Sequence, residues 1–262
     1  MSEPKVITAL KKKTIEYVRL KEELIRDWQR DAPEDWAYGC GQMWDLAVLH
    51  LVENDIKGAK ELFLQANKLA LVNNHIREDF PSIKKIQIET SICVYLGGNV
   101  EMACPFAEYI LSLVGELEPT KESIKAFWAW QWSLLALMIS DYNRLKRYLK
   151  YIEDIVSGYS LGSDGLPITR NINHYNYGYS IYGMNMIQGI ISKNSDMVAK
   201  NIELYSQVLT MALKRTDTPS ALADLELIVI YDLALKNGLC RKVITPFIPS
   251  KVLENGYWNK RT

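Results

Sequence analysis

One short string in the chain has the residue types and spacing of a nucleophilic active site. Gly158-Tyr159-Ser160-Leu161-Gly162 reads G-x-S-x-G, and Asp164 and His174 follow it along the chain. In hydrolases with this pattern, the serine lies on a sharp turn between a strand and a helix, where a histidine activates its hydroxyl. Residues 145–156, just before the string, have helical spacing instead. We therefore expect Ser160 to have no catalytic role.

Other residues suited to catalysis or metal binding are few. The chain has three histidines, and its four cysteines share no C-x-x-C spacing. Histidine is the commonest general acid or base, and zinc sites combine histidine with closely spaced cysteines. The sequence therefore predicts a protein that is not an enzyme and that has neither a metal site nor a cofactor. The three histidines are His50, His75 and His174, and the four cysteines are Cys40, Cys93, Cys104 and Cys240.

The composition is that of a folded protein without a strongly charged surface. The 262 residues are 48% hydrophobic, and 31 Lys and Arg residues balance 31 Asp and Glu residues. A net charge of zero gives no electrostatic reason to expect binding to nucleic acid or to an anionic membrane. The longest apolar-rich run, 126–139, is too short to span a bilayer. We therefore expect a cytoplasmic protein.

Helical periodicity runs through most of the chain, and these helices must position any functional group. Trp36, Cys40, Trp44, Ala47 and Leu51 are spaced by 4, 4, 3 and 4 residues, which places them on one helix face. Sustained alternation of apolar and polar residues, the pattern of strands, does not occur in the sequence. The sequence predicts an all-α protein of about ten helices.

An internal repeat organises the helices. Four residues that can cap a helix, Asp55, Asn99, Asp141 and Ser195, are separated by 44, 42 and 54 residues. Apolar or aromatic side chains fill fifteen of the sixteen places that lie 4, 7, 11 and 14 residues beyond these anchors, with Ser206 as the exception. This pattern is typical of repeated αα-hairpins of the tetratricopeptide or HEAT kind.

We predict a single α-helical repeat domain over residues 1–262, curled into a compact bundle. The runs 126–139 and 175–191 are apolar on nearly all faces, and such helices are normally buried. The turns are expected near Asn54, Gly98, Ser140 and Asn194. The expected elements are a first helix over 3–30, antiparallel hairpins over about 34–73, 81–115, 121–157 and 172–214, a closing helix over 219–237 and a tail over 238–262.

Two parts of the chain are candidates for a partner-binding surface. Residues 31–62 hold seven acidic and two basic side chains, and segregated charge can steer a partner, so we choose Asp31, Glu34 and Asp35 as its charged part. Tyr, Asn and Gly, which are frequent in binding surfaces, are enriched in residues 171–179. There, Asn173 and Tyr177 point away from the expected core stripe of Tyr175, Tyr179 and Tyr182, so we expect both to be exposed.

The C-terminal part resembles a known family. Residues 224–239 contain Leu233-Ala234-Leu235-Lys236-Asn237-Gly238-Leu239, and Pro246-Phe247-Ile248-Pro249 follows after a short connector. This segment is similar to the end of bacterial immunity proteins of the immunity protein 49 type, in which a helix of the form L-A-x-x-x-G-L leads into a short connector and a closing I-P-x-x-L. The resemblance implies an all-α protein that binds and neutralises a cognate secreted toxin and has no chemistry of its own.

Two functions therefore stay open. The first is an immunity protein, for which the acidic residues 31–35 would suit a basic toxin such as a nuclease. The second is a helical-repeat scaffold or regulatory protein-binding module unrelated to toxins. A toxin gene directly upstream would favour the first of these functions.

Overall fold

The protein is all-α in its computed structural model, as the helical periodicity predicted. No strand occurs in the described part of the chain, which comprises Lys12, Arg26 and residues 36–73, 91–98, 100–112, 122–160, 174–213, 222–239 and 243–258. The helices are α2 (Trp36–Val52), α3 (Ile56–Asn73), α5 (Val100–Ser112), α6 (Glu122–Met138), α7 (Tyr142–Ser157), α8 (His174–Ile191), α9 (Ser195–Leu213), α10 (Leu225–Lys236) and α11 (Ser250–Asn255). Residues 91–96 are also helical.

Three of the hairpin turns share one backbone geometry. Each has a residue with left-handed backbone conformation just after a helix: Asn54, Ser140 and Lys193, with φ of 60°, 59° and 57°. The residue that follows donates its N–H to the carbonyl five positions earlier. This is the Schellman ending of a helix, which gives partners to carbonyls that the helix leaves unbonded. These bonds are Asp55 to His50, Asp141 to Ala136 and Asn194 to Gly189, at 2.8, 2.9 and 2.8 Å.

The residue that ends one helix in these turns also caps the next. The side chains of Asp55, Asp141 and Asn194 each accept the backbone N–H three residues further on, at 3.0 Å. Such an N-cap satisfies an N–H that has no partner inside the helix. The turns near Asn54, Gly98, Ser140 and Asn194 are all confirmed, whereas the anchor at Ser195 is wrong by one residue. Ser195 is the first residue of α9, and Asn194 is its cap.

The chain divides into two compact units. That residues 1–262 form a single repeat domain stays a prediction. Unit 1 comprises Met1–Ala103, Arg215–Val229 and Pro246–Thr262, and unit 2 comprises Cys104–Lys214 and Ile230–Thr245. Each unit therefore combines segments that are far apart in the sequence.

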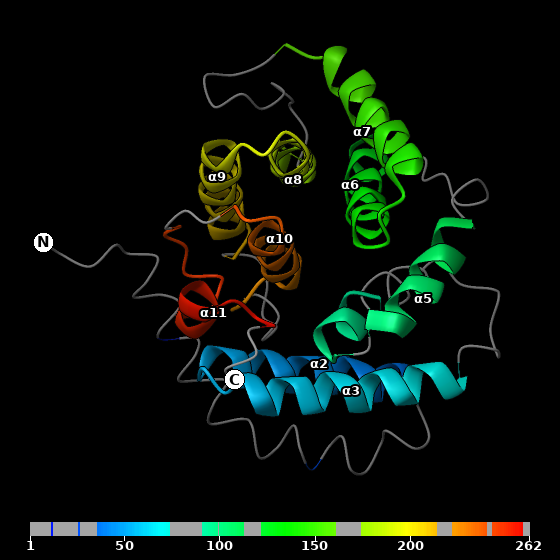
Figure 1. Cartoon of the computed structure of the whole chain (residues 1–262), viewed down its shortest axis with the longest axis vertical. Coiled ribbons are helices and arrows are strands. Elements are labelled where there is room, and N and C mark those ends of the chain that lie inside the picture. Colours follow the sequence, from blue (N-terminus) through cyan, green and yellow to red (C-terminus); the bar gives the residue numbers. More distant parts are fainter. Residues whose placement is uncertain are drawn as a thin grey trace, which may run out of the picture. The chain divides into compact units, whose positions relative to one another are not determined.

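In unit 1, the C-terminal segment packs on the first hairpins. Helices α2 and α3 lie side by side (Figure 1). The side chain of Asn54, in the turn between them, accepts the backbone N–H of Lys251 at the start of α11 at 3.1 Å. Further along, the buried Tyr257 donates its hydroxyl to the carbonyl of Leu96 at 2.8 Å. The ammonium nitrogen of Lys60 in α3 lies 4.4 Å from the centre of the Trp258 ring.

In unit 2, α6 packs against both α7 and α8 (Figure 1). Phe127 of α6 contacts the ring of Tyr179, and Trp130 lies directly against Gly183. Through these contacts α6 and α8 approach each other closely. The all-round apolar character of 126–139 is thereby explained: most side chains of α6 are buried, and the indole of Trp130 is completely enclosed.

The remaining boundaries agree in part with expectation. The first helix, expected over 3–30, lies outside the described residues apart from Lys12 and Arg26, which are helical. The closing helix was expected from residue 219, but α10 begins at Leu225 because Asp224 caps it, accepting the N–H of Leu227 at 2.8 Å. That the hairpins are copies of one repeat stays a prediction.

The packing at Gly183 predicts the effect of a single methyl group. A β-carbon at this position would overlap the indole of Trp130. Gly183→Ala should therefore lower the free energy of unfolding by about 1–3 kcal/mol, measured by urea denaturation. Gly158→Ala is the matched control, since Gly158 ends α7 in a right-handed conformation and has no atom closer than 3.7 Å to an added carbon. If both variants are equally stable, the packing account is wrong.

The double role of the turn residues can be tested at Asp141. Asp141→Ala should lower the free energy of unfolding by about 1 kcal/mol, because the N–H of Arg144 loses its acceptor. Asp141→Asn keeps an acceptor oxygen and removes only the ion pair with Arg144, so it should stay within about 0.5 kcal/mol of wild type. Equal losses in the two variants would show that the ion pair, rather than the cap, stabilises the turn.

Candidate functional site

The G-x-S-x-G string does not have the surroundings of a nucleophile elbow. The segment before it is the helix α7, where an elbow needs a strand. Ser160 is exposed, two residues after the helix cap Gly158. The remainder of the string lies outside the described residues, as does Asp164.

The expectation that Tyr177 is exposed is wrong. Its side chain is only 4% exposed, and its hydroxyl donates to the hydroxyl of Tyr159 at 3.0 Å. The two rings lie 5.3 Å apart. A single buried stripe on α8 would leave Tyr177 exposed. The segment after α7, however, covers a second face of α8 through Tyr159. Tyr177 is therefore a packing residue of unit 2.

The other proposed contact residues cannot be placed. Asp31, Glu34, Asp35 and Asn173 lie outside the described residues. The candidate surface is thus not assembled within the described part of the chain, and its acidic part stays a prediction.

An outward-facing surface on α7 was missed by the sequence analysis. Tyr142, the first residue of this helix, is 52% exposed, and Lys146, Arg147 and Lys150 are exposed beyond it. The opposite side of α7 is buried, through Leu145, Tyr148, Leu149 and Ile152. The signal was present in the sequence, because a helix whose apolar stripe is known has a known outward face.

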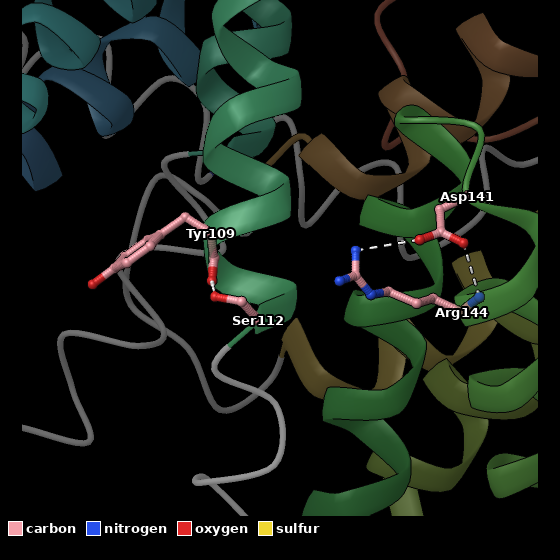
Figure 2. Close-up of polar contacts among 4 residues, drawn as sticks. All are labelled: Tyr109, Ser112, Asp141 and Arg144. Atoms are coloured by element: carbon pink, nitrogen blue, oxygen red, sulfur yellow. Dashed lines mark hydrogen bonds and ion pairs between the residues drawn. The ribbon is translucent and has the colours of Figure 1, made fainter.

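A polar cap holds the start of this helix, and an exposed ion pair lies in its second half. Figure 2 shows Asp141 accepting the backbone N–H of Arg144 and, at 3.2 Å, its guanidinium. The same view also shows a contact in another helix: at the end of α5, the Ser112 hydroxyl donates to the carbonyl of Tyr109. Towards the end of α7, Lys150 donates to Asp154 at 2.5 Å, and this hydrogen bond raises the pKa of Lys150.

Polar groups that are buried or half-buried lie in both units. In unit 2, the hydroxyls of Ser206 and Thr245 are 2.6 Å apart, which explains how the one polar residue of the repeat pattern is accommodated. In unit 1, burial raises the pKa of Asp224, Glu226 raises it further, and the hydrogen bond from Leu227 opposes the change. Since the folded state holds this proton more tightly, ionising Asp224 at higher pH reduces the stability of unit 1.

Two further observations concern the described residues alone. No three of their His, Cys, Asp or Glu side chains come together as metal ligands would. None of their helices is long and apolar enough to cross a bilayer. Comparison of the whole chain with protein-family models gives no match, and comparison with curated proteins gives none either.

The burial of Tyr177 leads to a stability prediction. Tyr177→Ala should lower the free energy of unfolding by about 3–5 kcal/mol, because it leaves a cavity between α8 and the segment after α7. Tyr177→Phe keeps the ring and loses one hydrogen bond, so its loss should be about 1 kcal/mol. Chemical denaturation measures both changes. A Tyr177→Ala variant as stable as wild type would place this side chain at the surface after all.

Proposed function

We propose that this chain is an immunity protein of the immunity protein 49 type, which binds a cognate secreted toxin in the cytoplasm and neutralises it by stoichiometric contact. The observation that carries the proposal is the C-terminal resemblance over residues 224–253. An all-α fold is what that resemblance implies, and α10 and α11 occupy this segment.

The residues of the resemblance have definite structural roles. Gly238, at φ 75°, ends α10 in the left-handed conformation that favours glycine. Leu239 then donates its N–H to the carbonyl of Ala234 at 3.0 Å and is itself buried. Ile248 is buried and Pro249 leads into α11. The L-A-x-x-x-G-L and I-P spacings thus coincide with the end of α10 and the start of α11.

In this proposal the chain acts by occupying a surface of the toxin. The acidic residues Asp31, Glu34 and Asp35 form the charged part of the contact and suit a basic toxin, such as a nuclease whose own surface attracts phosphate. Long-range attraction between opposite charges speeds the encounter of the two proteins. Fast capture is useful to an inhibitor that must act before the toxin reaches its target.

The test starts from the gene directly upstream. Expressed alone, its product should stop growth, and coexpression of this chain should restore it. With the purified proteins, Glu34→Lys combined with Asp35→Lys should slow association by about tenfold at low salt and reduce its salt dependence. The matched control reverses two exposed acidic residues elsewhere, Glu203→Lys with Glu254→Lys, and should associate like wild type.

Two results distinguish failure of the immunity function from failure of the acidic contact alone. If the upstream product is neither toxic nor bound, the immunity function is wrong, and a scaffold or regulatory module becomes the better account. If the toxin is bound and neutralised but the Glu34 and Asp35 variant associates at the wild-type rate, only the acidic contact is wrong.

A further inference from the structure

We propose that the outward face of α7 is a docking surface for an acidic region of a partner protein. This surface, called the basic face below, consists of Tyr142, Lys146, Arg147 and Lys150. It is separate in sequence from the acidic residues 31–35 and opposite to them in charge. The inference goes beyond the proposed function, because it requires no toxin and stands on the geometry of one helix.

The orientation of the basic face is fixed by the rest of the helix. Asp141 caps α7, and the buried side chains of Leu145 and Ile152 hold its other side against unit 2. Tyr142, Lys146 and Lys150 are spaced by four residues, so they form one row on the exposed side. An exposed tyrosine at the end of a row of cations offers a large, rigid apolar contact next to charge, a combination that is enriched at protein interfaces.

The positive charge of this face is only partly balanced. Residues 142–150 contain four cations and no acidic residue. Arg144 is paired with Asp141, and Lys150 is paired with Asp154. Lys146 and Arg147 have no carboxylate partner among the described residues, although the guanidinium of Arg147 lies 5.3 Å from the ring of Tyr148.

The arrangement of these charges disfavours the isolated helix. Lys146 and Lys150 are four residues apart, and Arg147 is three from Arg144 and three from Lys150, so like charges are neighbours. Arg144, Lys146 and Arg147 also lie in the first half of α7, whereas Glu153 and Asp154 lie nearer its C-terminus. This order is the reverse of what the helix dipole favours. An acidic partner surface would relieve the repulsion, and this complementarity identifies the kind of partner.

A protein fits this surface better than a nucleic acid does. A nucleic-acid surface needs many cations spread along a groove, and nucleic-acid-binding domains usually carry a large net positive charge. Here, two cations lack a carboxylate partner among the described residues and the whole chain is neutral. Tyrosine and arginine, by contrast, are the residue types that most often dominate the binding energy of protein interfaces.

The test uses the full chain and labelled poly-L-glutamate as the acidic probe, with oligothymidylate of equal charge as a comparison. Fluorescence anisotropy at low salt should detect binding of poly-L-glutamate. Lys146→Glu with Arg147→Glu should weaken it by about tenfold, and Tyr142→Ala by about threefold. The control Lys57→Glu with Lys200→Glu reverses two exposed cations outside α7 and should stay within about twofold of wild type.

Several results would overturn the proposal. Absence of poly-L-glutamate binding would do so, as would an equal loss in the control variant. Tighter binding of oligothymidylate with the same dependence on Lys146 and Arg147 would identify a nucleic-acid surface instead. Self-association of the wild type in sedimentation, abolished in the Lys146 and Arg147 variant, would identify a second copy of the chain as the occupant. Circular dichroism checks that each variant is folded.

Discussion

The structure depends on the way in which one residue ends a helix and begins the next. A left-handed residue such as Ser140 is unfavourable for an amino acid with a side chain, at about 1–2 kcal/mol. The hydrogen bonds of the turn offset this cost, because Asp141 donates its N–H to the carbonyl of Ala136 in α6 and its carboxylate accepts the N–H of Arg144 in α7. With no spare residue in the turn, the second helix has a fixed starting point, and so does the face that it turns outward.

The second constraint is that α6 and α8 have almost no polar face to expose. Trp130 of α6 lies against Gly183 of α8, and α7 and α9 pack beside these two helices. Glycine at this one position allows an indole to approach the backbone of the neighbouring helix. The aromatic side chains between these helices therefore serve packing first, and Tyr177 belongs to such packing rather than to a binding surface.

Much of the fold could be predicted because short-range rules govern it. Cap residues, turn residues and apolar spacing located the turns at Asn54 and Ser140, but they could not choose between Asn194 and Ser195, since both are good caps. Tyr177 was misjudged because a helical wheel assumes one buried side, whereas a second side of α8 is covered at Tyr159, in the segment after α7. The outward face of α7 could have been found from its stripe. The identity of a partner depends on another molecule, which the sequence does not describe.

The central proposal is that the chain acts by forming a stoichiometric complex with its target. Binding predicts a fixed stoichiometry, whereas catalysis would let one chain act on many targets. The most direct measurement is a titration of the purified product of the upstream gene with this chain, following the remaining toxic activity. The account predicts a linear loss that is complete at one chain per toxin molecule. Full activity at excess chain, or complete loss far below equivalence, would contradict it.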